Sequence, residues 1–177
     1  MLKLIYSLLT FLFLISCYLG YYLAETYPEV TKREMKNLEE FFRSFAQAKL
    51  SFIEIFALIF INNSVKSFFA MLLGIFFGIV PVLFLFLNGL IIGLFAKFIG
   101  EKIGLLKFIL LLLPHGILEI PAVILACSYG FQLGVEFARN RKGIVKHVKK
   151  AVKNFFKFVI PMLLVAAMIE TFLISIS

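Results

Sequence analysis

The chain has 177 residues, of which 62% are hydrophobic, and its mean hydropathy is +1.03. Soluble domains are roughly 45–50% apolar, so this composition excludes an ordinary soluble protein and predicts an integral membrane protein. The net charge is +8, and eight of the eighteen Lys and Arg residues lie between Arg139 and Lys157 with no acid among them. Beside a membrane segment, such a run predicts contact with anionic lipid headgroups rather than with nucleic acid.

The N-terminal third predicts one membrane span and one amphipathic helix. Residues 4–23 are an unbroken apolar run, long enough for a first transmembrane helix and longer than the core of a usual signal peptide. Apolar residues then recur at i, i+3 and i+4, which predicts an amphipathic helix over residues 29–61. This helix would lie at the membrane interface or pack against the bundle.

The middle of the chain predicts three core spans, over residues 67–87, 89–113 and 115–134. Pro81 interrupts the first of them, and Asn88-Gly89 reads as a break before the second. Residues 90–99 are too short to span alone, so they form either a tilted helix or one half of a broken one.

The C-terminal part predicts a basic amphipathic helix on the membrane surface over residues 141–157 and a last span over residues 158–176. The positive-inside rule places the basic loop 139–157 in the cytoplasm and the protein in the cell membrane. The expected fold is a single membrane domain over residues 1–177. It is an all-α, polytopic transmembrane helix bundle of about five spans with broken or re-entrant helices, plus amphipathic interfacial helices.

A polar cluster interrupts the apolar stretch at residues 108–127. It contains His115, Gly116 and Glu119, flanked by Pro114 and Pro121. Ionisable groups at membrane depth are costly, and prolines there free backbone groups that need other partners. A specific function is therefore expected in this segment.

Three interpretations of His115 and Glu119 remain open, because residues four apart on a helix share one face. In the favoured one, the two side chains satisfy each other and the freed backbone groups. In the second they bind a divalent metal, which needs two copies across a dimer axis or help from Glu170, because zinc takes about four ligands. In the third they form a proton or ion relay with Glu170 and Glu54. No other cofactor is expected.

Amides and glycines beside the spans form a supporting set. Asn62, Asn63, Asn88 and Gly89 flank predicted spans, where amides hydrogen-bond across helices. Two broken segments facing each other are typical of transporter binding sites, and they suit a rigid scaffold equally well.

Eight of the eleven glycines form four pairs with GxxxG spacing, which lets helix backbones approach closely. The pairs are Gly74/Gly78, Gly89/Gly93, Gly100/Gly104 and Gly130/Gly134. Packing inside one bundle is favoured over a dedicated homodimer interface.

Catalytic motifs of soluble enzymes are missing from the sequence. It has no HExxH, no nucleophile elbow, no P-loop and no GxGxxG, and it contains two His and no Asp. The sequence therefore predicts that the protein is not an enzyme.

The string PHGILEIPA at residues 114–122, with Asn62-Asn63, Gly74, Gly78, Asn88-Gly89 and Gly93, resembles the stage II sporulation protein M family of multi-pass membrane proteins. The resemblance covers about residues 52–134. It implies a membrane scaffold that holds partner proteins, and it places His115, Gly116 and Glu119 in the family signature. The sporulation role itself does not follow, because most members occur in organisms that do not sporulate.

Two functions are expected from these features. The first is a non-enzymatic membrane scaffold or assembly protein, a homodimer with unidentified membrane protein partners. The alternative is a small ion, proton or solute transporter or channel that uses the core around His115 and Glu119.

Overall fold

The structure is a computed structural model that describes residues 1–29, 31 and 50–176, but not the side chains of residues 111 and 115. Its helices are α1 (Leu2–Thr26), α3 (Phe52–Leu72), α4 (Ile79–Ile103), α5 (Leu105–Arg139), α6 (Ile144–Asn154) and α7 (Ile160–Ile176). Short 3-10 turns cover Leu73–Ile75 and Arg141–Gly143, and a π-helical segment covers Phe155–Val159. Five helices are long and apolar enough to cross a membrane, which confirms the predicted all-α fold with five spans.

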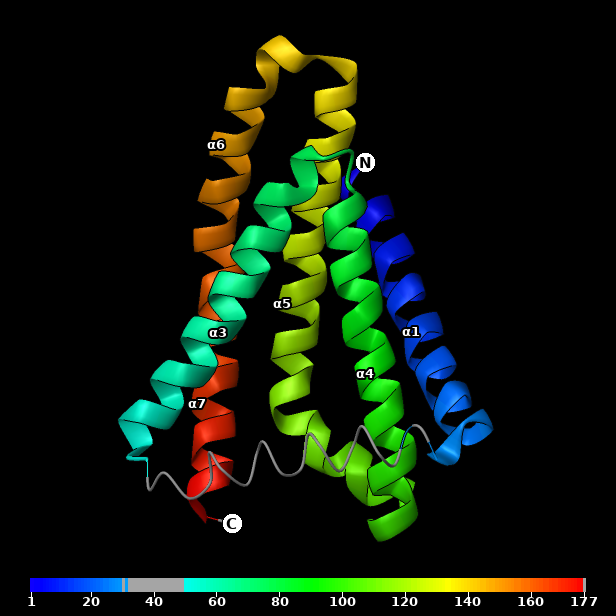
Figure 1. Ribbon diagram of the computed structural model, residues 1–177. Helices are drawn as coiled ribbons and strands as arrows, with labels where there is room; N and C mark the ends of the chain where they lie inside the picture. The colour runs from blue at the N-terminus through cyan, green and yellow to red at the C-terminus, as the bar shows by residue number, and fades with distance from the viewer. Residues whose placement is uncertain (30, 32–49, 177) are drawn as a thin grey trace.

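The two ends of the bundle are distinct (Figure 1). The N-terminus, the α3–α4 turn and the α5–α6 hairpin lie at one end, here called the hairpin end. The end of α1, the start of α3, the α4–α5 turn and the C-terminus lie at the other, here called the C-terminal end. Four spanning helices separate the N-terminus from the basic run of residues 139–157, and this even number of crossings puts both on the same side.

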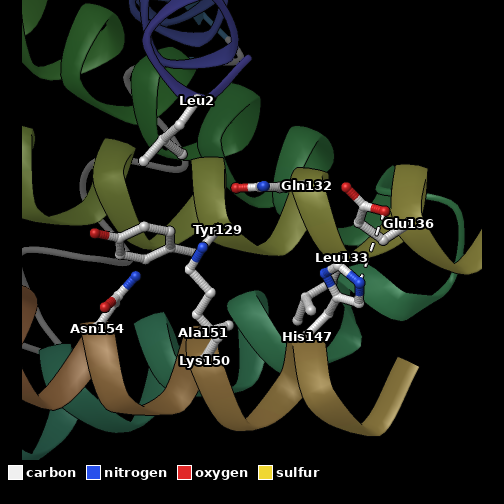
Figure 2. Close-up of a pocket in the computed structure, with 9 residues that line it drawn as sticks. All are labelled: Leu2, Tyr129, Gln132, Leu133, Glu136, His147, Lys150, Ala151 and Asn154. Atoms are coloured by element: carbon white, nitrogen blue, oxygen red, sulfur yellow. Dashed lines mark ion pairs between the residues drawn. The ribbon is translucent and has the colours of Figure 1, made fainter. Parts of the chain in front are cut away.

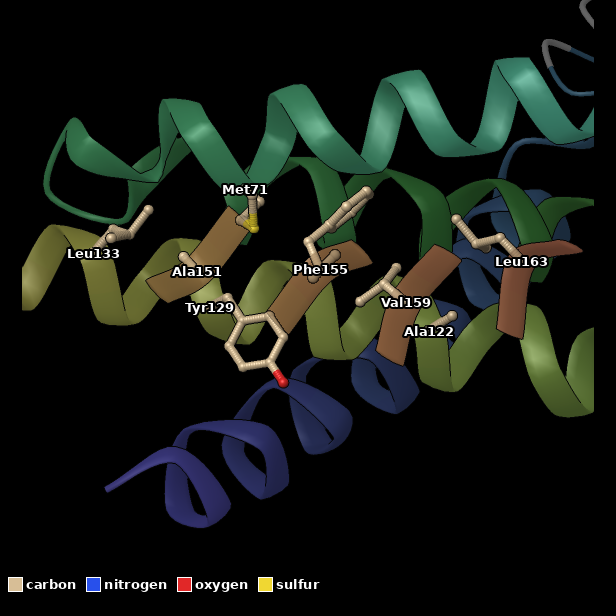
Figure 3. Close-up of a cluster of buried hydrophobic side chains, with 9 residues drawn as sticks. Met71, Ala122, Tyr129, Leu133, Ala151, Phe155, Val159 and Leu163 are labelled. Carbon is tan, nitrogen blue, oxygen red and sulfur yellow. The ribbon is translucent and has the colours of Figure 1, made fainter. Parts of the chain in front are cut away.

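Helix α5 is the centre of the molecule. Half of the residues in the most apolar 18-residue stretch of its spanning part, Gly116–Arg139, are buried inside the bundle. One apolar cluster joins it to α3 and the α6–α7 helix (Figure 3). Its buried members are Met71, Ala122, Ala126, Tyr129, Leu133, Ala151, Phe155, Val159 and Leu163. A second cluster joins α5 to α1 and α4, through Ile5, Leu9, Phe13, Leu85, Ile124 and Cys127. The helices around α5 expose many large apolar side chains, as a lipid environment requires.

The predicted amphipathic helix over residues 29–61 is wrong at its C-terminal part, and residues 32–49 lie outside the described part of the chain. Residues 52–61 are the first half of the spanning helix α3. That helix begins at a capping box, in which the Ser51 N–H donates to a Glu54 carboxylate oxygen at 2.7 Å and the Glu54 N–H donates to Ser51 Oγ at 3.4 Å. Glu54 is therefore a cap residue, which marks a helix start that the apolar periodicity concealed.

The predicted span over residues 67–87 is also wrong, because the chain reverses within it. Phe77 and Gly78 both have positive φ angles, of 54° and 74°, and the left-handed conformation ends the helical path. α4 then starts at Ile79, so Pro81 lies in its first turn. A proline there costs no helical hydrogen bond, because the first N–H groups of a helix have no partner in it.

The predicted break at Asn88-Gly89, between spans 67–87 and 89–113, is absent from α4. The helix continues through both residues to Ile103 and ends at Gly104, where φ is +93°. The Asn88 side-chain amide donates to the carbonyl of Phe84 at 2.6 Å, one turn earlier in the same helix. This pair of residues usually marks a turn, but here the glycine has a packing role.

Helix α5 continues through Pro114 and Pro121 as 35 helical residues. Its membrane-spanning part is Gly116–Arg139, and Leu105–Pro114 is a shorter apolar helix that precedes it. Figure 1 shows the first turns of α5 lying at an angle to the upright remainder. The signature residues 114–122 therefore begin the span close to the C-terminal end of the bundle, and the predicted span 115–134 extends further, to residue 139.

The predicted basic surface helix over residues 141–157 differs from the observed α6. The observed α6 stands upright, continues through the π-helical segment into α7, and packs against α5 (Figure 1). Its apolar face meets the core through Ile144, Val148 and Ala151, so this face is not available to lie on lipid. The helix from Arg141 to Ile176 has 36 residues, roughly 54 Å at 1.5 Å per residue. A hydrocarbon layer is about 30 Å thick, so the basic part projects beyond it.

Candidate functional site

The register of α3 against α5 places Asn63 at the level of Glu119. A Cβ added to Gly74 would overlap the backbone of Gly130, so the two glycines lie side by side. The two helices run in the same direction (Figure 1). Gly74 lies in the 3-10 turn that follows α3, and eleven residues before the two glycines are Asn63 of α3 and Glu119 of α5, so this amide and this carboxylate lie at a similar depth in the bundle.

Charged groups from two other helices act on Glu119. They are Glu170 of α7 and Lys66 of α3, which lie close enough to influence its carboxylate electrostatically. Glu119 and Glu170 are half-buried, whereas Lys66 is exposed on the outside of α3. The arrangement brings two carboxylates, an ammonium group and an amide to the α3, α5 and α7 side of the bundle, where they can hold a proton or pair with a cationic group.

Two predicted members of the site lie elsewhere. Gly89 faces α1, where an added Cβ would overlap Ser16 Oγ, and Asn88 is bonded within α4. Glu54 caps the start of α3 and is exposed, so it takes no part in a relay with Glu119. Asn62 is exposed, and its amide donates to Asn63 Oδ1 at 3.4 Å.

The side chain of His115 lies outside the described part of the structure, so its pairing with Glu119 stays a prediction. Gly116 is not required by close packing, because an added Cβ would lie 3.5 Å from Ile120 and 3.6 Å from Leu112 at the nearest. Among the described residues, no group of three or more His, Cys, Asp or Glu could hold a metal ion. The metal interpretation of His115 and Glu119 likewise stays a prediction.

The glycines bring helices together within one chain. Gly74 meets Gly130, and an added Cβ on Gly134 would overlap the backbone N of Gly78. On the other side of the bundle, Gly89 and Gly93 of α4 face α1. Gly100, by contrast, has only ordinary neighbours, the nearest at 3.4 Å, and Gly104 forms the turn between α4 and α5.

Sequence reasoning missed three residues in these interfaces. Gly20 of α1 lies against the backbone of Leu90 in α4. Ser64 and Ser67 of α3 are buried, and their hydroxyls have no hydrogen-bond partner among the described residues. The spacing of Asn63 and Ser67 along α3, with Gly74 in the turn that follows, is the signal that would have found this small and polar face.

Comparison with known proteins gives one family. The model of the family described as Stage II sporulation protein M matches residues 9–174, nearly the whole chain. Neither the curated proteins nor the solved structures that were compared gave a match.

Proposed function

Because the chain belongs to the stage II sporulation protein M family of multi-pass membrane proteins, we propose that it is a non-enzymatic membrane scaffold that holds a partner against α3. The observation that carries this proposal is the outward-facing pair of Asn62 and Lys66, one helical turn apart. Apolar side chains surround the pair, and Ile61, Val65 and Phe69 are 57%, 46% and 55% exposed.

The depth of this pair makes exposure to lipid costly. The spanning stretch runs from Phe52 to Ile75, so Lys66 lies between two and three residues past its midpoint, or about 4 Å. A lysine near the centre of a spanning helix costs roughly 2.5–3.5 kcal/mol on insertion scales. Glu119 attracts Lys66 electrostatically, and a partner helix that supplies a carboxylate within ion-pair distance would reduce this cost further.

The charge of Lys66 favours a partner other than a second copy. Two copies related by an axis normal to the membrane would place their Lys66 residues at the same depth on facing helices. Like charges there would repel each other in a medium of low dielectric constant. The packing glycines are used inside the chain, so they provide no independent reason for a homodimer.

Site-specific photo-crosslinking in native membranes tests the scaffold. A photoreactive amino acid at Val65 should give one discrete adduct with a different membrane protein, and the same amino acid at Ile91, exposed on α4, should give none. Lys66→Leu should reduce that adduct about tenfold, the equivalent of roughly 1.4 kcal/mol, and Lys66→Arg should retain it. Adducts with lipid alone, or an adduct that ignores Lys66→Leu, would contradict the proposal. An adduct between two copies would identify the homodimer instead.

The group around Glu119 supports a second candidate function, the movement of a proton or ion. Its two carboxylates and one ammonium group come from three helices, within spanning segments. Purified protein in liposomes with an internal pH or ion-sensitive dye tests this candidate. A saturable flux that Glu119→Gln abolishes and Glu54→Gln leaves unchanged would favour transport over the scaffold.

We also propose that the hairpin end faces the cytoplasm of a cell with this protein in its plasma membrane. The eight basic residues between Arg139 and Lys157 support this orientation, because cationic loops remain on the cytoplasmic side. The projecting hairpin would then bring its cations to the anionic inner leaflet.

A further inference from the structure

A small cavity of about 130 Å³ opens between α1, α5 and α6 at the hairpin end (Figure 2). Its lining does not include Glu119, Glu170 or Lys66. Its lining consists of Leu2 from α1, Tyr129, Gln132, Leu133 and Glu136 from α5, and His147, Lys150, Ala151 and Asn154 from α6.

Three polar side chains of this cavity lack partners. Lys150 is exposed and the amides of Gln132 and Asn154 are half-buried, and none of the three forms a hydrogen bond or ion pair with the described residues, so all three are available to a ligand from outside. Figure 2 shows Lys150 reaching from α6 toward α5, between Asn154 and His147, with Gln132 on the facing helix. An ammonium group and two amides supply several N–H donors to one small space.

The one carboxylate of the cavity, Glu136, faces His147 rather than Lys150. A Glu136 carboxylate oxygen lies 3.9 Å from His147 Nε2, at one edge of the cavity, as the dashed line in Figure 2 marks. The amides of Gln132 and Asn154 and the Tyr129 hydroxyl can each turn a donor toward a ligand in this space, next to the Lys150 ammonium group. Basic residues that follow in the hairpin, without an acid between Arg139 and Lys157, add a positive field around it.

We propose that this cavity binds a phosphate group, with Lys150 as its counter-ion and Gln132 and Asn154 as hydrogen-bond donors. Phosphate oxygens form strong charge-assisted hydrogen bonds with ammonium groups. The depth suits a phospholipid headgroup, because Leu2 is the first residue of α1 and marks where that span begins. Leu133 and Ala151 give the cavity an apolar wall as well. Free inorganic phosphate has the same chemistry and is the other source.

Lipid binding to the full-length protein in detergent, followed by native mass spectrometry, tests this site. Phosphatidylglycerol should bind with one preferred stoichiometric site, and Lys150→Ala should weaken that site about tenfold, as expected for the loss of one charge-assisted contact. Lys149→Ala is the matched control, because Lys149 is exposed, carries the same charge and does not line the cavity. Asn154→Leu should cause a smaller loss, and Lys150→Arg should retain most of the affinity.

The two phosphate sources are distinguished by competition. Displacement of the lipid from the Lys150 site by excess inorganic phosphate would identify free phosphate as a ligand, whereas persistence of the lipid would identify the headgroup. Equal losses in Lys150→Ala and Lys149→Ala would show only general attraction to a basic surface and would overturn the site. Equal binding of diacylglycerol, which lacks the phosphate, would overturn it too.

Discussion

Single glycines determine how closely the helices of this protein approach each other. Gly74 and Gly130 meet backbone to backbone between α3 and α5, so neither position has room for a side chain. Gly116, in the signature string, is different, because its nearest neighbours are flexible side-chain atoms at ordinary distances. Glycines within the spanning helices thus have different structural roles, and substitution by a larger residue distinguishes those that are required for packing from those that are not.

Gly130→Leu should destabilise the protein, because an added Cβ would lie 2.9 Å from the backbone of Met71 and α3 would have to move. Overpacking of this kind costs about 1–3 kcal/mol. Gly116→Ala is the matched control and should be neutral or slightly stabilising, because alanine favours a helix over glycine by about 1 kcal/mol. Thermal unfolding in detergent measures both. Equal midpoints for wild type and Gly130→Leu would mean that this helix contact does not form.

At the scale of elements, the α6–α7 helix shows how an amphipathic pattern finds its partner. The apolar stripe of α6 has the pattern of a helix that lies on lipid, which is the arrangement that the sequence predicts. In the structure the same stripe packs against α5, because the two helices form an antiparallel hairpin that buries Ala151 and Phe155. The change to π-helical geometry at Phe155–Val159 falls where this helix passes from the hairpin into the bundle.

Phe155→Ala should destabilise the hairpin strongly, since Phe155 is 1% exposed and the centre of its ring lies 5.2 Å from the centre of the Phe68 ring. Truncation of a buried phenylalanine costs about 3–5 kcal/mol. Phe156→Ala removes a phenyl ring from the adjacent residue, which is 58% exposed, and should have a much smaller effect. Thermal unfolding of the two variants in detergent compares them directly. Similar losses would show that α6 does not pack on the core as described.

At the scale of the whole molecule, the proposed orientation depends on five crossings and one concentrated basic run. The hairpin end carries the N-terminus and eight cations, while the C-terminus lies at the opposite end. With an odd number of spans, the two termini lie on opposite sides of the membrane, so one labelled position at each end tests the whole arrangement.

Cysteine labelling should show this orientation. In a background with Cys17 and Cys127 replaced, Asn140→Cys at the hairpin end should react with an impermeant maleimide only after permeabilisation of the cells. Ser175→Cys at the C-terminal end should react in intact cells, since both residues are exposed. Reaction at both positions in intact cells would contradict the five-span arrangement, and the reverse pattern would contradict the proposed orientation.

The candidate site followed from the sequence only in part. The family string predicts a site around Glu119, and the structure brings Glu170 of α7 near enough to interact with Glu119 electrostatically. Asn88 and Gly89 were assigned to the same site because Asn-Gly usually breaks a helix, whereas here α1 covers the glycine and α4 remains continuous. The role of Lys66 was not foreseen, because its position opposite Glu119 depends on the register between α3 and α5.

The sequence by itself determined the membrane class, the all-helical fold and the number of spans, because hydropathy and length largely decide how many segments can cross a lipid layer. It also determined where the cations lie. Only the tertiary structure decided where α3 ends, which face of α6 is buried and which glycines meet. The physical reason is that turns at Gly78 and contacts at Gly130 depend on residues distant in sequence, whose packing overrides the local preferences that a sequence pattern reports.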